Sequence, residues 1–366
     1  RDVSDLFWKN LNMFSLNDYH YDLPPELIAQ QPAAQRDRSN LLHLDRQTGA
    51  LSHHSFNEIG AFLKPGDVLV VNDTAVIPGR LEGKKSTGGN VEVLLCNYAE
   101  GCQSSDKNGD LIYKCLVKAS KRPGPGTRIF FADGLKAEVL EARNGLHTLK
   151  FYVNGDFETL LDKIGQVPLP PYIKRNHSGV APCDDKASYQ TVYAGPRGAI
   201  AAPTAGLHFT EALLNNLRTE GVHIVTLTLH VGYGTFLPVR VADIRKHQIH
   251  SEQFTIEAKS AKTINNAKNC GKRVVAVGTT CVRTLEYAVN SNGDVAAGSG
   301  RCDLFIIPGH LFKVVDAMIT NFHLPQSTLL MLVSAFAGRK NILNAYREAI
   351  SRKYRFYSYG DAMLIT

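Results

Sequence analysis

Four histidines of this chain lie in segments that mix polar residues with large apolar ones: His208, His230, His310 and His323. A buried polar group costs about 1–3 kcal/mol unless it is hydrogen-bonded, so such a mixture suits a shaped site better than a plain core or a plain loop. Histidine also exchanges protons near pH 7 without a large pKa shift. We therefore expect one pocket assembled from distant segments, with His208, His230 and His323 as catalytic candidates. For each, the alternative is a hydrogen-bonded structural histidine.

Two charged residues and one loop accompany these histidines. Glu252 is a candidate carboxylate partner, and the alternative is an ordinary solvated glutamate. Arg283 could bind a carboxylate bidentately, and the alternative is a surface salt bridge. The loop Gly278-Thr279-Thr280 stands before an expected helix and could offer backbone N–H groups to an anion. Its alternative is a plain turn between a strand and a helix.

The elements that would position these groups alternate between strand and helix. The apolar run 68–71 ends at Asn72-Asp73-Thr74, and the strands expected at 223–229 and 273–277 end at loops rich in Gly and Thr. Apolar spacing predicts helices at 211–220, 257–269, 282–289, 329–336 and 342–353. Repeated β-α units imply a largely parallel sheet covered by helices, and ligand sites in such sheets form at the carboxyl ends of the strands.

The pattern changes between about residues 80 and 152. Short apolar runs follow one another there, separated by Gly-rich turns and without a helical period, which predicts a small antiparallel barrel. We therefore expect an α/β fold (α+β overall), with a main domain formed by residues 13–74 and 154–366 and a β-barrel domain inserted at 75–153. Residues 1–12 look detached, and we expect an N-terminal extension or an expression remnant.

Composition narrows the class of protein. The chain has 366 residues, of which 44% are hydrophobic and 20% charged, as in a globular protein in water. It contains no apolar run of 18 residues and its start does not resemble a secretory signal, so we expect a cytoplasmic protein without a membrane span. Seven cysteines are spread without a C-x-x-C pair, and no H-E-x-x-H occurs. We expect neither a disulfide framework nor a metal site.

A formal net charge of +7 permits a polyanionic partner without establishing one. Basic residues cluster in or beside the expected barrel and at the return to the main domain. Those that could contact phosphates are Arg80, Lys84, Lys85, Lys121, Arg122, Lys174 and Arg175. The alternative is that they are ordinary solvated side chains on exposed loops.

Common nucleotide and hydrolase motifs are absent from the sequence. Gly232-Tyr233-Gly234 lacks the third glycine of a dinucleotide-binding loop, and Pro238 follows closely. No G-x-x-x-x-G-K-[ST] and no G-x-S-x-G occurs, which argues against a P-loop and against an α/β-hydrolase nucleophile.

Taken together, four blocks carry a family resemblance: residues 202–209 (Ala-Pro-Thr-Ala-Gly-Leu-His-Phe), 230–236 (His-Val-Gly-Tyr-Gly-Thr-Phe), 277–283 (Val-Gly-Thr-Thr-Cys-Val-Arg) and 320–325 (Thr-Asn-Phe-His-Leu-Pro). In this order they resemble the S-adenosylmethionine:tRNA ribosyltransferase-isomerases of queuosine biosynthesis, over nearly the whole chain from about Asp18 to Met363. Ala75 stands where the family often has a basic residue, and Cys281 where it often has serine.

The resemblance implies an unusual use of S-adenosylmethionine, as a substrate that donates its ribosyl part and not its methyl group. The acceptor would be 7-aminomethyl-7-deazaguanine in the wobble position of tRNA, and the products epoxyqueuosine-tRNA, adenine and methionine. The partner would thus be tRNA, contacted by the basic residues above, and we expect a monomer. Two other classes stay open: a non-catalytic tRNA-binding protein, and a small-molecule lyase or isomerase.

This chemistry needs a base near the sulfonium-adjacent carbon, an acid for the departing adenine and a neutral attacking amine. The candidates for these proton transfers are the three histidines and Glu252, and which is base and which is acid stays open. Aromatic faces could stack on a base or face the sulfonium. The candidate substrate-binding residues are Thr204, Gly206, Phe209, Gly232, Gly234, Thr235, Phe236, Thr279, Thr280, Arg283, Asn321 and Phe322.

Overall fold

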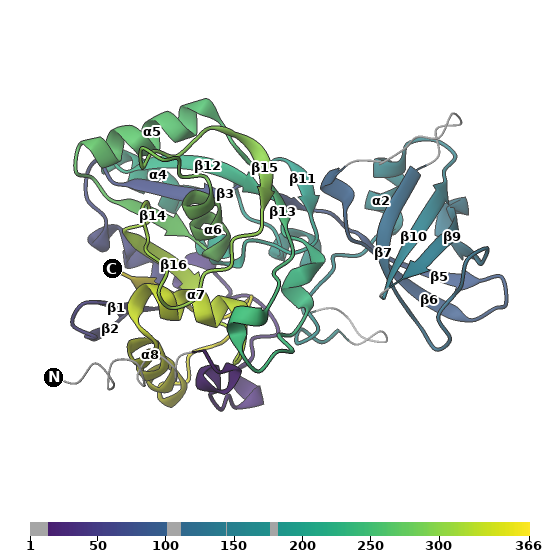
Figure 1. Ribbon diagram of the computed structural model, residues 1–366, viewed down its shortest axis with the longest axis horizontal. Helices are drawn as coiled ribbons and strands as arrows, with labels where there is room; N and C mark the ends of the chain where they lie inside the picture. The colour runs from purple at the N-terminus through teal and green to yellow at the C-terminus, as the bar shows by residue number, and fades with distance from the viewer. Residues whose placement is uncertain (1–13, 101–110, 144, 176–181) are drawn as a thin grey trace.

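The computed structural model describes residues 14–100, 111–143, 145–175 and 182–366. The extension expected at residues 1–12 lies outside them. The described chain forms an α/β part and, beside it, a separate β-barrel (Figure 1). The fold class predicted from the sequence is confirmed.

A nine-stranded sheet forms the centre of the α/β part, in the order β15-β13-β12-β3-β14-β16-β17-β1-β2. The strands are β1 (Asn40–Leu44), β2 (Leu51–Ser55), β3 (Val68–Asn72), β12 (His223–Leu229), β13 (Glu252–Ile256), β14 (Val274–Val277), β15 (Gly298–Cys302), β16 (Ala317–Asn321) and β17 (Ala362–Ile365). Strands β12, β3, β14 and β16 run parallel, whereas β13 and β15 add antiparallel strands at one edge. At the other edge β17 runs antiparallel to β16 and parallel to β1, and β2 closes the sheet antiparallel to β1. The run of neighbouring parallel strands is thus confined to the centre of the sheet.

Alternating side chains divide the core between the two faces of this sheet. On β3, Val68 and Val70 belong to one buried cluster, and Leu69 and Val71 to another. The first face is covered by α5 (Ala258–Asn269), α6 (Thr279–Tyr287), α7 (Thr328–Ala337) and α8 (Arg339–Ser351). The second is covered by α4 (Glu211–Thr219) and the 3-10 helices η4 (Phe56–Phe62) and η7 (Thr204–His208). Whether a residue occupies an odd or an even position along a strand therefore decides on which face of the sheet its side chain lies.

Shorter elements complete this part of the molecule. They are the 3-10 helices η1 (Leu16–Tyr19), η2 (Pro25–Leu27), η3 (Arg36–Arg38), η8 (Tyr233–Phe236) and η9 (Ile244–Lys246), and the helix α3 (Asp185–Ser188). None of the helices within the described ranges is long and apolar enough to cross a membrane.

The barrel is closed by six antiparallel strands in the order β10-β7-β6-β5-β8-β9. They are β5 (Arg80–Lys85), β6 (Asn90–Leu95), β7 (Leu111–Ala119), β8 (Arg128–Phe131), β9 (Lys136–Arg143) and β10 (Leu146–Tyr152), with the 3-10 helices η5 (Tyr98–Glu100) and η6 (Ala132–Gly134). The parallel pair β4 (Ala75–Val76) and β11 (Arg197–Ala199) lies beside it. Helix α2 (Phe157–Ile164) places Phe157 and Leu161 in the barrel's own core. The barrel unit thus extends beyond residue 153, where the sequence pattern ended it, because this helix is needed to cover its interior.

Candidate active site

His208 lies on the second face of the sheet, at the carboxyl end of β16. Its Nδ1 is 2.7 Å from the hydroxyl oxygen of Ser39, its Nε2 is 3.3 Å from Nδ2 of Asn321, and its ring stacks on Phe56. Asn321 follows Ala317 and Ile319 on that face, so its side chain reaches the histidine. Both ring nitrogens of His208 are therefore occupied in this structure.

His323 lies on the opposite face of the same strand end. Its Nε2 is 2.8 Å from the hydroxyl oxygen of Thr320, which follows Met318 on the first face. Its backbone N–H donates to the hydroxyl of Tyr346, and its carbonyl oxygen accepts from Tyr21. The two histidines, which were expected in one pocket, therefore do not lie together. Their partners Asn321 and Thr320 are adjacent on β16, and adjacent side chains of a strand point to opposite faces of the sheet.

Burial also decides the charge of these two imidazoles. It lowers the pKa of His208 to about 3, with a smaller contribution from the positive charge of Arg355, and it lowers the pKa of His323 to about 3. Both rings are neutral at physiological pH. This differs from the expectation of groups titrating near pH 7, because the sequence does not reveal how fully a histidine is enclosed.

His230 has a different environment, beside a small cavity of about 180 Å³ at the carboxyl ends of β3 and β12. Its Nδ1 is 2.7 Å from the hydroxyl oxygen of Thr74, and no hydrogen bond to its Nε2 occurs within the described part of the chain. The cavity is also lined by Asp73, whose carboxylate accepts from the hydroxyl of Thr228 at 2.6 Å. Of the histidine candidates, His230 is thus the one placed beside this cavity.

Three titratable groups line this cavity, Asp73, His230 and Glu257, and the first two have pKa values displaced toward each other. Burial lowers the pKa of His230, whereas burial raises the pKa of Asp73, against the opposing effect of the hydroxyls of Thr228 and Thr226. A neutral imidazole can accept a proton, and a carboxyl of raised pKa can donate one. The imidazolium and carboxylate that result would carry opposite charges and would not be left as two unpaired charges.

Glu252 and Arg283 form a buried ion pair on the first face. Arg283 Nη1 donates to Oε2 of Glu252 at 2.5 Å, and its Nε donates to the carbonyl oxygen of Leu304 at 3.0 Å. The other carboxylate oxygen accepts the backbone N–H of Gly232 at 2.9 Å. The pair thus anchors the loop after β12, which carries His230, and neither partner is a solvated surface charge.

The Gly-Thr-Thr loop and η7 meet above the carboxyl end of β14. An added Cβ on Gly278 would lie 3.6 Å from Cβ of Ala205, and Asn72 links β3 to Thr280 at 3.3 Å. Thr279 is buried, whereas Thr204 is half-buried. These segments, far apart in sequence, lie side by side in the structure.

Three buried polar atoms around η7 have no hydrogen-bond partner among the described residues. They are the hydroxyls of Thr191 and Tyr193 and the Oδ1 of Asn321. The tyrosine hydroxyl packs against Gly206, where an added Cβ would lie only 2.1 Å from it. Burial raises the pKa of Tyr193 well above its usual value, so this group remains a donor. Buried groups without partners are rare, and a cluster of them marks a place for a polar ligand.

Two of the aromatic candidates for substrate binding lie in the core. Phe209 and Phe322 are fully buried in the two core clusters, Phe209 against Phe56 and Phe322 against Tyr346 and Phe356. Their rings stabilise the core and have no exposed face in this structure, so it gives no support to the expected stacking on a substrate. The side chain of Phe236 lies outside the described residues, Thr235 is exposed, and Gly234 packs against His250.

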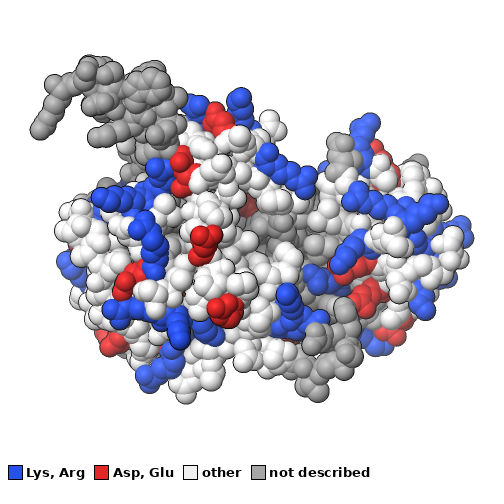
Figure 2. Space-filling model, turned by 90° about the horizontal axis from the view of Figure 1, so that it is seen from below, with Lys and Arg blue, Asp and Glu red and all other residues white. Residues whose placement is uncertain are grey.

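The basic candidates divide into side chains that hold a partner in the structure and side chains that are exposed. Lys85 is buried and donates to the carbonyl oxygen of Lys121, Arg175 holds Asp185, and Arg80 donates to the carbonyl oxygen of Leu169. Lys85 in particular cannot reach a phosphate, which corrects the sequence-based expectation. Four are exposed: Lys84, Lys121, Arg122 and Lys174. Figure 2 shows Lys and Arg side chains in adjoining patches over the barrel, at the right of that view.

A family described as queuosine biosynthesis protein matches residues 16–365 of this chain. The chain belongs to this family. Two relatives, each named S-adenosylmethionine:tRNA ribosyltransferase-isomerase, come from Syntrophotalea carbinolica and Geotalea uraniireducens. The first is 51% identical over 351 residues and the second 53% over 352, each covering 96% of this chain and 99% of the relative. A crystal structure of S-adenosylmethionine tRNA ribosyltransferase from Thermotoga maritima is similar, with 36% identity, a TM-score of 0.53, and coverage of 95% of this chain and 100% of that one.

Membership of the queuosine biosynthesis family confirms the resemblance carried by the four sequence blocks. Asp73, Thr191 and Tyr193 are candidate site residues that could not be identified from the blocks of the sequence. A signal existed for Asp73, since it follows the buried strand β3 directly. No periodicity marks Thr191 or Tyr193, because they reach Gly206 from an irregular segment.

Proposed function

We propose that this chain transfers the ribosyl part of S-adenosylmethionine to 7-aminomethyl-7-deazaguanine in the wobble position of tRNA and isomerises it. The products would be epoxyqueuosine-tRNA, adenine and methionine. Family membership supports this proposal, as do the names of the relatives, which specify both the donor and tRNA. S-adenosylmethionine is in this account a substrate that is consumed.

The observation that carries the chemistry is the cavity shared by His230 and Asp73. Removal of a proton from the carbon beside the sulfonium needs a neutral base, and the lowered pKa of His230 keeps its imidazole neutral. The departing adenine needs a proton, and the raised pKa of Asp73 favours a carboxyl group that can hold one. We assign the base to His230 and the acid to Asp73.

The size of the cavity limits what it holds. At about 180 Å³ it is smaller than the roughly 300–1,000 Å³ of typical ligand pockets, so it admits the reacting part of the substrates and not two whole nucleosides. The unpartnered hydroxyls of Thr191 and Tyr193 and the Oδ1 of Asn321 would then bind polar groups of the substrate farther along the rim.

The other catalytic candidates fit supporting roles better than proton transfer. His208 and His323 are enclosed and neutral, so we assign them to holding Asn321 and the turn after β16 in place. Glu252 is committed to Arg283 and to Gly232 N–H, so we assign it to positioning the loop that carries His230.

The activity is tested by incubating the protein with S-adenosylmethionine, with and without tRNA that carries the aminomethyl base. We expect adenine and methionine to appear in equal amounts only with this tRNA, whose mass rises by the transferred ribosyl part. A methylated tRNA product would overturn the proposal.

The same assay separates the two alternatives. Binding of tRNA without any adenine release would indicate a non-catalytic tRNA-binding protein. Adenine release that is as fast with the free base as with tRNA would indicate a small-molecule enzyme.

A further inference from the structure

A row of exposed side chains crosses the outer surface of the barrel and alternates between aromatic and basic residues. In the strand register Tyr152 pairs with Lys136, Lys136 with Phe130, Phe130 with Lys84, and Lys84 with Asn90. All five are exposed, and we call them the aromatic–basic row. Paired residues on adjacent strands point to the same side of a sheet, so the row is continuous across β10, β9, β8, β5 and β6.

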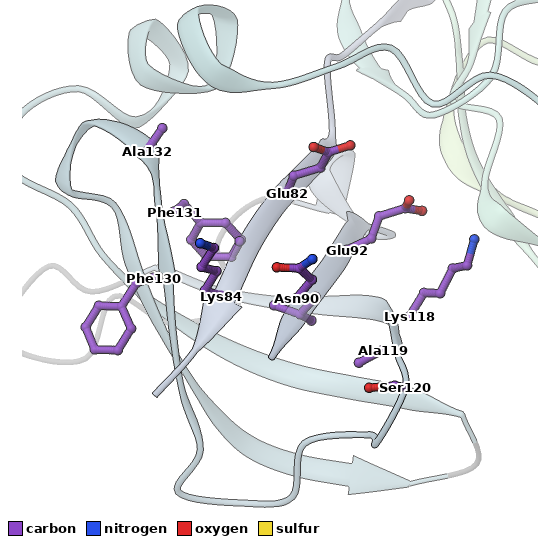
Figure 3. Close-up of a pocket in the computed structure, with 12 residues that line it drawn as sticks. Glu82, Lys84, Asn90, Glu92, Lys118, Ala119, Ser120, Phe130, Phe131 and Ala132 are labelled. Carbon is purple, nitrogen blue, oxygen red and sulfur yellow. The ribbon is translucent and has the colours of Figure 1, made fainter. Parts of the chain in front are cut away.

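A hollow of about 1080 Å³ lies over one end of this row. Phe130, Lys84 and Asn90 follow one another across it, and Lys118 stands at its opposite side (Figure 3). Gly83 lies between Glu82 and Lys84 with its other side against the barrel core, where an added Cβ would lie 2.7 Å from the carbonyl oxygen of Phe130 and 2.8 Å from the ring of Phe131. The hollow is large enough to receive a nucleotide, unlike the small cavity beside His230.

Phe130 and Lys84 are the members of the row most available to a ligand, whereas the hydroxyl of Tyr152 donates to Oε2 of Glu138 at 3.0 Å. Phe130 is 41% exposed, although its neighbours Ile129 and Phe131 are buried. No ion pair or side-chain hydrogen bond of Lys84 or Lys118 occurs within the described residues. This contrasts with Lys85, whose ammonium group is tied to the carbonyl oxygen of Lys121.

Charge favours a polyanion on this part of the molecule. Residues 80–152 contain twelve Lys and Arg against eight Asp and Glu, so 73 residues supply four of the chain's seven net positive charges. Two carboxylates, of Glu82 and Glu92, also line the hollow and face each other in the register. These carboxylates would repel a phosphate, so the backbone of the ligand should lie near Lys84 and Lys136. The carboxylates are then placed to accept N–H groups of a base.

We propose that the aromatic–basic row binds an unpaired nucleotide stretch of RNA, with one base stacked on Phe130 and the flanking phosphates on Lys84 and Lys136. Exposed rings between lysines fit single strands, because a base must leave its helical stack before it can lie on an aromatic face. The inference deepens the proposed function and rests on it, since it assigns the tRNA contact to an unpaired segment of the substrate, bound at a distance from the reacting groups.

The test measures affinity for the precursor tRNA and for a short single-stranded RNA by fluorescence anisotropy. Phe130→Ala should weaken binding about 5- to 150-fold, the range that one base–aromatic stack represents, whereas Phe130→Trp should retain it. Leu140→Ala is the matched control, because Leu140 is 42% exposed on β9 and lies outside the row. Melting curves of each variant show that the barrel is folded.

The lysines are tested by the dependence of binding on salt. Lys84→Ala and Lys136→Ala should each lower the slope of log affinity against log salt by about 0.7 for a single strand, and Lys114→Ala, on the exposed side of β7, should leave it unchanged. Equal affinities of Phe130→Ala and Leu140→Ala would overturn the inference, as would equal competition by an RNA duplex. A wild-type protein that binds tRNA through this row but releases no adenine would instead overturn the proposed function.

Discussion

The Nδ1 of His230 lies 2.7 Å from the hydroxyl oxygen of Thr74, a residue 156 positions away in sequence. This contact joins the loop after β12 to the loop after β3, and it leaves Nε2 as the ring nitrogen that is available to a substrate. A threonine hydroxyl can donate to Nδ1 or accept from it, so Thr74 fixes the position of the ring, and a base at Nε2 requires the tautomer in which Nδ1–H donates to Thr74. His230 is thereby distinguished from His208, both of whose nitrogens are engaged.

Replacement of His230 is the first test of this assignment. His230→Ala should lower turnover about 10²–10⁴-fold, the usual contribution of a general acid–base group, with little change in melting temperature. His223→Ala is the matched control, since His223 lies exposed at the start of the same strand. Turnover of His230→Ala that equals that of the control would remove the histidine from the mechanism.

The packing of Tyr193 on Gly206 gives a second prediction. Gly206→Ala should destabilise the protein and reduce turnover, because the new methyl group would lie 2.1 Å from the tyrosine hydroxyl. Tyr193→Phe removes that oxygen, so the double variant should recover part of the stability, although Thr191 still crowds the site at 2.9 Å. Gly195→Ala serves as the control, since its nearest neighbour would be 4.0 Å away.

In the double variant of Tyr193→Phe and Gly206→Ala, we expect stability to recover in part and turnover not to recover. Tyr193→Phe alone should keep the fold and lower turnover, because a buried donor for the substrate has been lost. Normal kinetics of Tyr193→Phe, measured as kcat and KM for S-adenosylmethionine, would show that the unpartnered hydroxyl is only a packing group.

The sequence predicted the larger features well because they depend on local patterns. Apolar runs such as Val68–Val71 identify buried strands, and short runs between Gly-rich turns identify the barrel. It could not predict the face on which each polar residue lies. Thr320 and Asn321 are adjacent, yet alternation places their histidine partners on opposite sides of β16.

The sequence also could not predict how fully each side chain is buried. Phe209 and Phe322 stand in blocks rich in polar residues, which made them look like contact residues, but tertiary packing encloses both. The pairing of Glu252 with Arg283 joins residues 31 positions apart through the antiparallel strand β13 and helix α6, a combination that no motif encodes.

The buried ion pair leads to a third prediction. Glu252→Gln should destabilise the protein by about 3–5 kcal/mol, because it leaves the guanidinium of Arg283 buried without a counter-charge. Arg352→Gln, which breaks the exposed pair with Glu348, should cost far less, because water screens that pair. Urea unfolding of the two variants measures the difference, and equal losses would show that burial does not set the strength of the Glu252 pair.

Stability should also fall as the solution becomes acidic, because His208 and His323 have folded-state pKa values of about 3 against about 6.5 in the unfolded chain. Between these values the unfolded chain binds more protons than the folded one, so the free energy of unfolding decreases with falling pH. Their contribution is fully present above pH 6.5 and is lost progressively toward pH 3, at about 1.4 kcal/mol per pH unit for each histidine.

This pH dependence is measured by urea unfolding at a series of pH values between 4 and 8. His208→Gln removes the titrating ring while keeping a polar group near Ser39 and Asn321, so it should lower stability at pH 8 but flatten the loss below pH 6.5. The exposed His223→Gln should leave the slope unchanged. A slope that is the same in the wild-type protein and in His208→Gln would mean that this imidazole can take up a proton without unfolding, and that its enclosure is not what keeps it neutral.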